Sequence, residues 1–153
     1  MALVELLLTP LPAHVRTARL VGVAAARRAG LDDELVDELR LALGEACSRA
    51  VGLHARHALG APVQVTVSDE PTRLTVTVTD VGPAAGPAPD DVARGLFETN
   101  PDDEQLVDPD VALAVLAGLV DGMDISPGET GTTVTMHWPL PLDAAPGATL
   151  ISR

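Results

Sequence analysis

Two carboxylates in this chain are placed where rigid elements would hold them. Asp80, Val81 and Gly82 follow an alternating apolar segment, and Glu45 lies 35 residues upstream in a segment of helical periodicity. A side chain that moves a proton must lie within hydrogen-bond reach of it on a rigid element, and a buried helix is such an element. An aspartate followed by glycine after a strand is also common in ordinary turns. Together the two features predict one half of a nucleotide-binding site.

The charged residues exclude some kinds of partner. The chain has ten arginines and no lysine, so a Walker-type phosphate loop, whose lysine reaches the phosphates, is excluded. Residues 1–60 hold seven arginines and seven acids, whereas residues 61–153 hold three arginines and fifteen acids and carry the whole net charge of −12. This distribution argues against a nucleic-acid partner, which needs a basic face. It is compatible with a basic protein partner, and equally with a role in solubility alone.

Length and composition are most simply those of one domain with an aliphatic core. Phe97 and Trp138 are the only aromatic residues among 153, so the core must consist of Leu, Val and Ala. The single cysteine, Cys47, cannot form an internal disulfide. No secretory signal is evident, and no apolar run approaches the ~20 residues that a membrane span needs. We therefore expect a cytoplasmic protein with no membrane partner.

The first half of the chain predicts two helices and three strands. An apolar strand over residues 2–8 ends at prolines, and a helix over 13–29 ends at Gly30. A second, mostly buried helix begins near Asp32 and runs to about Ala58. Alternating apolar residues over 63–67 and 74–78, separated by a turn at 69–72, then predict a β-hairpin with one buried face.

The second half begins with a long segment rich in Pro, Gly, Ala and acids. We interpret residues 83–110 as a lid, with one short helical turn at 92–97. A buried helix over 111–120 with Gly122 as its cap, an extended piece over 124–126, a turn at 127–131 and a strand over 132–138 follow. Residues 141–153 are predicted to form a flexible tail. This order predicts an α+β two-layer sandwich over residues 1–140, in which helices cover one face of a mixed or antiparallel sheet.

Three segments in this order resemble a known superfamily. They are the helix Leu39–Val51, which reads LRLALGEACSRAV, then Asp80–Gly82, and then Ala112–Leu116. Their order and spacing resemble the GHKL (histidine-kinase-like) ATPases, and within these the small anti-sigma-factor serine kinases of bacteria. The resemblance spans residues 5–138.

The resemblance implies roles for several residues of this chain. Glu45 would be the general base that acts on water or on a substrate serine. Asp80 would accept the amino group of adenine, and the positions of Gly82 and Ala84 are those where glycines let the backbone approach the nucleotide. Thr132, in the segment Gly131–Thr133, would face the nucleotide.

Other positions depart from the family pattern. Arg49 stands where the family has an asparagine that ligates Mg²⁺, so a fixed cation replaces an oxygen ligand. Arg49 is expected to neutralise Glu45 through an i,i+4 ion pair, to meet an anionic ligand directly, or to lie on the surface of a decayed site. Asp110 and Ala112 replace the glycines of the phosphate loop. Each like-charge contact between a carboxylate and a phosphate at ~4 Å would cost about 4 kcal/mol.

The resemblance and these departures together predict a binding module rather than an enzyme. We expect an anti-sigma-factor-like regulator that acts by partner switching, with a degenerate ATP site, and that binds a sigma factor, a STAS-type anti-sigma antagonist, or each in turn. The resemblance also implies that the protein could form a homodimer. No metal site and no cofactor are expected, and ATP with Mg²⁺ would bind only if the site is functional. Two alternatives remain: an active ATP-dependent protein serine kinase with Glu45 as base, and a sensor that binds another nucleotide in the remnant pocket. For His54 and His57 we expect solvated or capping roles.

Overall fold

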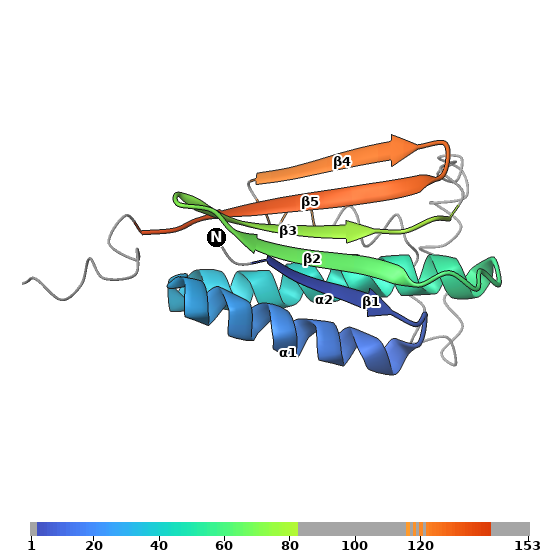
Figure 1. The fold of residues 1–153 in the computed structure, drawn as a ribbon, viewed down its shortest axis with the longest axis horizontal. Coiled ribbons are helices and arrows are strands. Elements are labelled where there is room, and N and C mark those ends of the chain that lie inside the picture. Colours follow the sequence, from blue (N-terminus) through green and yellow to red (C-terminus); the bar gives the residue numbers. More distant parts are fainter. Residues whose placement is uncertain (1–2, 83–115, 117, 119, 121, 142–153) are drawn as a thin grey trace, which may run out of the picture.

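The computed structural model describes residues 3–82, 116, 118, 120 and 122–141. Two helices cover one face of a five-stranded sheet, an α+β arrangement in two layers (Figure 1). The elements are, in chain order, β1 Leu3–Leu8, α1 Pro12–Ala29, α2 Asp33–Arg56, β2 Val63–Asp69, β3 Arg73–Thr79, β4 Gly122–Gly128 and β5 Gly131–Pro139.

The strands lie in the order β1-β2-β3-β5-β4, and all four described pairings are antiparallel. Because β5 pairs antiparallel with β3 as well as with β4, the start of β5 lies beside the end of β3. Thr79 is the register partner of Thr133. This topology brings residues that follow β3 against residues about fifty positions later in the chain, and it positions the candidate site.

Helix α1 begins and ends at residues suited to those positions. Pro12 occupies the first turn, where the missing N–H costs nothing. Gly30 adopts φ 89°, the Gly30 amide donates to the Arg27 carbonyl at 3.1 Å, and the Leu31 amide donates to the Ala26 carbonyl at 3.0 Å. These two bonds form a Schellman motif, which satisfies the last carbonyls of the helix.

Helix α2 carries acids in its first turn, Asp33 and Glu34, where they complement the helix dipole. Its buried stripe packs on the sheet and on α1. Two glycines allow the close approach of the helices: a Cβ at Gly22 would overlap the Leu43 side chain, and a Cβ at Gly44 would lie 3.0 Å from Cδ of Arg19. The aliphatic stem of Arg19 therefore lies along the surface of α2.

The two faces of the sheet follow the alternation of the strands. Val65, Val76 and Val134 belong to a buried set on the helix-facing side, which also contains Trp138. The opposite face is lined by half-buried threonines of β2, β3 and β5: Thr66, Thr75, Thr77, Thr79, Thr133 and Thr135. The predicted hairpin and its buried face are thus confirmed.

Several predicted features differ in detail. The extended piece at 124–126 is a full edge strand, β4, so Gly122 begins a strand and pairs with His137 instead of capping a helix. The turn before β5 is correspondingly shorter than predicted, because β4 continues to Gly128. The described sheet is antiparallel, which is one of the two predicted arrangements, and α2 ends at Arg56, two residues before the predicted end.

Other predicted elements fall partly or wholly outside the described residues. The lid over 83–110, its helical turn and the tail beyond residue 141 belong to this group. Of the helix predicted over 111–120, Leu116 and Gly118 are helical, and the Val120 amide donates to the Leu116 carbonyl at 3.0 Å. Leu116 is fully buried.

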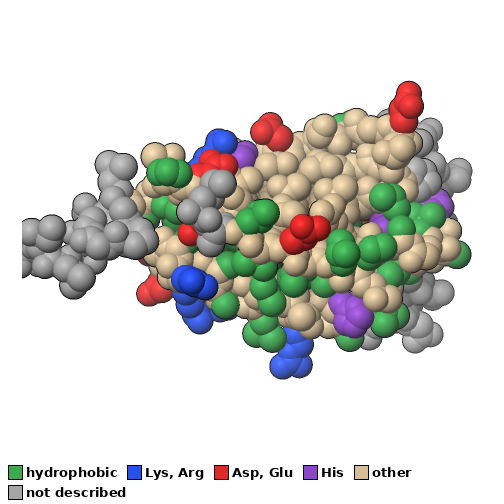
Figure 2. Space-filling view, in the orientation of Figure 1, with side chains coloured by type: hydrophobic (Ala, Val, Ile, Leu, Met, Phe, Trp, Pro, Cys, Tyr) green, Lys and Arg blue, Asp and Glu red, His purple; other side chains and the backbone are tan. Residues whose placement is uncertain are grey.

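The surface view shows where apolar side chains gather. Hydrophobic groups cluster over β1 and α1 in the lower half of the picture, whereas charged side chains are scattered (Figure 2). Leu3, Leu7 and Leu20 are each more than 60% exposed. In the described part of the chain, neither helix has the length and apolar character required to cross a bilayer.

Candidate functional site

The carboxylate of Asp80 is buried where β3 ends, and backbone amides surround it. Asp80 is 1% exposed. Its Oδ1 accepts hydrogen bonds from the amides of Gly82 at 3.0 Å and Thr132 at 3.3 Å, and its own amide donates to the Thr132 carbonyl at 3.0 Å. The first residues of β5 therefore hold this carboxylate in place, and Thr132 itself is 4% exposed.

Arg49 reaches this carboxylate from helix α2. Its Nη1 donates to Oδ2 of Asp80 at 2.7 Å, and the arginine is 7% exposed. The expectation of an ion pair between Arg49 and Glu45 is wrong, because Arg49 points to Asp80, 31 residues later in the chain. Glu45 is half-buried and enters no salt bridge with a described residue.

The guanidinium is incompletely satisfied. Nε of Arg49 is buried and has no hydrogen-bond partner among the described residues. A charged pair withdrawn from water loses much of its hydration, and the mutual attraction of the charges offsets this only when the geometry is good. The 2.7 Å contact is within the range of charge-assisted hydrogen bonds. Removal of either partner would leave the other as an uncompensated buried charge.

Two glycines make room for this arrangement. Gly131 has φ +147°, and a Cβ there would overlap the carbonyl oxygen of Asp80. A Cβ at Gly82 would lie 2.5 Å from Cδ2 of Leu53 on α2. The backbone of β5 and the segment after β3 can approach Asp80 and α2 only because both positions lack a side chain.

His54 connects α2 to the segment after β3. It is fully buried, which contradicts the expected solvated or capping role. Its Nδ1 lies 2.9 Å from the Ala61 carbonyl, and its Nε2 accepts a hydrogen bond from the Val81 amide at 3.0 Å. These partners assign the hydrogen to Nδ1 of a neutral imidazole. His57, by contrast, is the C-cap residue of α2.

Cys47 lies on the same helix but does not have the properties of a reactive thiol. Burial raises the pKa of the Cys47 thiol from its ordinary 9.0 to about 12, although the nearby Arg19 guanidinium lowers it in part. The described residues include no group of three or more His, Cys, Asp or Glu side chains arranged to hold a metal ion.

The structure brings together only some of the predicted site residues. Arg49, Asp80, Gly82 and Thr132 meet in one buried cluster. Glu45 lies on α2, four residues before Arg49. Ala84, Asp110 and Ala112 lie outside the described residues, so their predicted roles stay predictions.

His54 was not among the residues predicted to form this cluster. The sequence does indicate that His54 is buried, because Leu43, Cys47, Ala50 and His54 recur at the spacing of one buried helix face. A histidine on such a stripe needs two hydrogen-bond partners, and here they come from the segments that follow α2 and β3.

The comparison with protein-family models agrees with the fold. The family model described as histidine kinase-like ATPase domain matches residues 8–138, which includes every described element that contributes to the site. The search of curated proteins found no match. Since the match covers most of the chain, this protein belongs to the family of histidine kinase-like ATPase domains, within the GHKL superfamily.

Proposed function

We propose that this protein is a regulatory binding module of the anti-sigma type, and that it binds its protein partners without Mg-ATP. The observation that carries the proposal is the buried ion pair between Arg49 and Asp80, with a distance of 2.7 Å from Nη1 to Oδ2. By resemblance to the anti-sigma serine kinases, these two residues stand where the family binds magnesium and adenine. In this chain they bind each other.

The pair leaves little capacity for adenine at Asp80. Oδ1 already accepts two backbone amides, and Oδ2 accepts the Arg49 guanidinium. The amino group of adenine is a neutral donor, and neutral hydrogen bonds are roughly half as strong as charge-assisted ones. An entering adenine would have to share Oδ2 with the stronger Arg49 donor, so the pair weakens adenine binding at Asp80.

The same substitution disfavours the metal. Mg²⁺ takes oxygen ligands, and arginine offers only donors and a positive charge. Asp110 and Ala112, which replace glycines of the phosphate loop in sequence, would add repulsion and bulk near a triphosphate. These changes all weaken the binding of magnesium triphosphate, which supports a degenerate site.

The proposed partners follow from the resemblance. They are a sigma factor, a STAS-type anti-sigma antagonist, or each in turn, and the binding of one would exclude the other. The acidic balance of residues 61–153 is compatible with a basic partner surface.

Calorimetric titration tests the nucleotide half of the proposal. We expect no saturable heat with ATP or ADP, with or without Mg²⁺, up to millimolar concentrations. The triple variant Arg49→Asn, Asp110→Gly, Ala112→Gly should gain Mg-dependent binding, and the further change Asp80→Asn should abolish it again. Micromolar, Mg-dependent ATP binding by the unmodified chain would defeat the proposal.

Pairwise mixing tests the partner half. Each sigma factor and each STAS-domain protein of the source organism is combined with the purified chain in nucleotide-free buffer and analysed by size-exclusion chromatography. At least one stable complex is expected, and its affinity should not change when Mg-ATP is added. The absence of a complex with every member of both classes would contradict the assignment.

An active protein serine kinase is the competing proposal, and one observation favours it. Glu45 is half-buried and outside the salt bridges of the described residues, so the carboxylate at the base position is not neutralised by Arg49. Transfer of the γ-phosphate to a serine of a STAS-domain protein, lost in Glu45→Gln but retained in Glu38→Gln, would establish this activity.

A further inference from the structure

A groove of about 390 Å³ on the helix layer is lined by four arginines. Three of them, Arg16, Arg19 and Arg27, belong to α1, and Arg40 belongs to α2. All four are exposed, and the described residues that line the groove all come from the two helices. The groove is thus separate from the cluster around Asp80, none of whose residues lines it.

Helix α1 has the opposite charge to the chain as a whole. It contains four arginines and no acid, whereas the whole chain has a net charge of −12. Arg16, Arg19 and Arg27 form no salt bridge with a described residue. Arg40 pairs with Asp37 at 3.1 Å, and that pair is exposed. Guanidiniums that share one groove repel each other, so the groove favours an anionic occupant.

Ordinary structural roles account for only part of this charge. Arg27 lies in the last turn of α1, where the helix dipole favours a cation. Arg16 and Arg19 lie in the first half of the helix, where the dipole gives a cation no advantage. The stem of Arg19 packs beside Gly44 of α2, which explains its position but not its charge.

The groove also has an apolar part. Leu20 is 64% exposed and Val23 is 7% exposed, and both line the groove. A phosphate chain or a simple anion would contact the arginines and leave Leu20 in water. Arginine is enriched at protein interfaces, and amphipathic helices bind by laying their apolar side chains into a groove. The groove is therefore suited to a protein segment that is both acidic and apolar.

We propose that this groove binds an acidic amphipathic helix of a partner protein. The apolar side chains of that helix would lie on Leu20 and Val23. Its carboxylates would pair with Arg16 and Arg27, since each guanidinium can donate two parallel hydrogen bonds. These two arginines are eleven residues apart on α1, about 16 Å along the helix axis, so the partner's acids should lie about three turns apart. The inference is independent of the proposed function, because it concerns a surface outside the nucleotide site.

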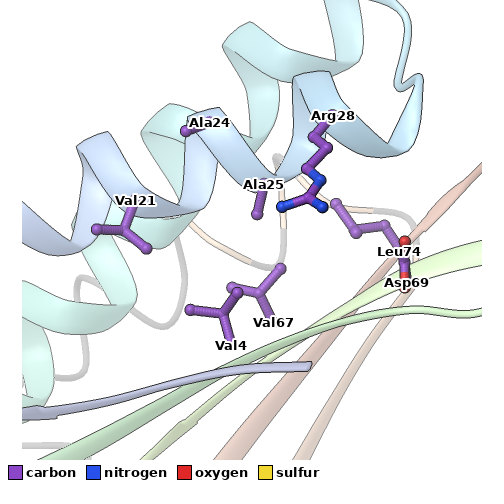
Figure 3. A pocket seen from close by; sticks show the side chains of 8 residues that line it. All are labelled: Val4, Val21, Ala24, Ala25, Arg28, Val67, Asp69 and Leu74. Atoms are coloured by element: carbon purple, nitrogen blue, oxygen red, sulfur yellow. The ribbon is translucent and has the colours of Figure 1, made fainter. Parts of the chain in front are cut away.

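The fourth arginine of α1 provides a matched control. Arg28 lines a different cavity, of about 220 Å³. Figure 3 shows its side chain directed from α1 toward the strands, near Ala25. Successive residues of a helix point about 100° apart, so Arg27 and Arg28 belong to different surfaces. A substitution of Arg28 therefore removes the same charge from the same helix without altering the groove.

Fluorescence anisotropy with a synthetic probe measures the proposed binding. The probe is a fluorescein-labelled peptide of about 18 residues, about 27 Å long as a helix, with leucines along one face and glutamates on both flanks. It should bind with a dissociation constant below about 1 mM, and the affinity should fall at least tenfold between 0.05 M and 0.5 M NaCl. Two control peptides should bind at least tenfold more weakly. One has glutamine in place of every glutamate, and the other has the same composition in an order that forms no apolar face.

Two double variants with equal changes of charge locate the site. Arg16→Gln, Arg27→Gln should weaken binding of the acidic peptide at least tenfold. Arg28→Gln, Arg56→Gln, whose residues do not line the groove, should bind it within twofold of the unmodified chain. Because all four side chains are exposed, both variants should keep the urea unfolding midpoint, followed by Trp138 emission.

The proposal is overturned if the acidic peptide binds no more tightly than either control peptide, or if the two double variants bind it equally. Duplex DNA of random sequence, and vesicles of phosphatidylcholine with phosphatidylglycerol, are titrated in parallel. Tighter binding of either one than of the peptide, weakened only in the variant of Arg16 and Arg27, would assign the groove to nucleic acid or to anionic lipid instead.

Discussion

At the residue scale, the contact between Arg49 and Asp80 dominates the candidate site. It joins a helix to the end of a strand through charges that are almost entirely withdrawn from water. Such a pair contributes modestly to net stability when intact, because desolvation offsets much of the attraction. The loss of stability becomes large when only one partner is removed. This difference between the intact pair and the broken pair distinguishes a buried ion pair from a surface ion pair in the same molecule.

A double-mutant cycle measures this difference. Arg49→Met should lower the free energy of unfolding by about 3–5 kcal/mol, because it leaves Asp80 as an unpaired buried charge. The double variant Arg49→Met, Asp80→Leu should recover part of this loss. Urea denaturation followed by Trp138 fluorescence provides the free energies.

The exposed pair between Arg40 and Asp37, at 3.1 Å, is the matched control. Its side chains are 45% and 71% exposed, so Arg40→Met should cost less than about 1 kcal/mol. Equal losses for Arg40→Met and Arg49→Met would show that the Arg49–Asp80 contact is not a buried pair in solution.

The burial of Cys47 predicts that the free energy of unfolding falls at alkaline pH. The folded thiol has a pKa of about 12 and the unfolded thiol one of about 9.0, so above pH 9 the unfolded chain releases a proton that the folded chain retains. The unfolded state is then favoured, and the free energy of unfolding falls with a slope that approaches about 1.4 kcal/mol per pH unit. The chain contains neither Tyr nor Lys, so no other side chain titrates in the window from pH 9 to 12.

The test compares the protein with Cys47→Ala between pH 8.5 and 10.5. The stability of the variant should be nearly independent of pH, whereas that of the protein should fall by about 1.5 kcal/mol between pH 9 and 10.5. In addition, an alkylating reagent at pH 8 should modify Cys47 only after denaturant is added. Parallel pH profiles for the two proteins would rule out the buried, protonated thiol.

At the element scale, the start of β5 is the position with the tightest backbone constraint. Gly131 combines a positive φ with contact to the Asp80 carbonyl, so Gly131→Ala must shift either β5 or the segment after β3. We expect a loss of at least 2–3 kcal/mol in the free energy of unfolding. Amide hydrogen exchange should show weakened protection at Thr132 and Gly82, whose amides bond to Asp80.

Gly60→Ala is the control for this prediction. A Cβ at Gly60 would meet no atom within 4 Å, and its φ lies outside the left-handed region. The substitution should be neutral or stabilise the fold by about 0.4–1 kcal/mol, because alanine restricts the unfolded chain. A similar cost at both positions would contradict the close approach of β5 to Asp80.

The elements differ in how readily the sequence predicts them. The alternation Val63, Val65, Val67 and its counterpart in β3 predicted the hairpin because one face is apolar throughout. The full length of strand β4 was not predicted, because Gly122–Gly128 shows no alternation of apolar and polar residues and includes Pro127. An edge strand pairs on one side only, so it tolerates proline and needs no buried face. Gly122–Gly128 is a strand because it pairs with β5, and this pairing cannot be recognised from the residues of β4 alone.

The contact between Arg49 and Asp80 shows the same limit within the site. Helical spacing suggested Glu45 as the partner of Arg49, since residues four apart lie on one helix face. The structure pairs Arg49 with a residue 31 positions away, because α2 packs against β3 and Asp80 follows the end of that strand. Helical periodicity shows which residues of one helix share a face. A contact between the helix layer and the sheet can be predicted only when the packing of the two layers is known.

At the scale of the whole molecule, the main feature is the excess of acidic over basic side chains. The net charge of −12 lies in residues 61–153, whereas residues 1–60 sum to zero. A large net charge of one sign repels itself, and this repulsion destabilises a compact state relative to an extended chain. The buried Arg49–Asp80 pair is protected from salt, but exposed acids such as Asp124 and Glu129 are not.

Added salt should therefore stabilise this protein. The Debye length falls from about 30 Å at 0.01 M to about 8 Å at 0.15 M, which screens repulsion between acids on different elements. We expect the melting temperature, followed by Trp138 emission, to rise by about 2–6 °C over this range, which corresponds to roughly 1–2 kcal/mol in a chain of this length. The variant Asp124→Asn, Glu129→Gln should have a higher melting temperature at low salt and a smaller rise. A melting temperature that falls with salt would mean that exposed attractive pairs outweigh the repulsion.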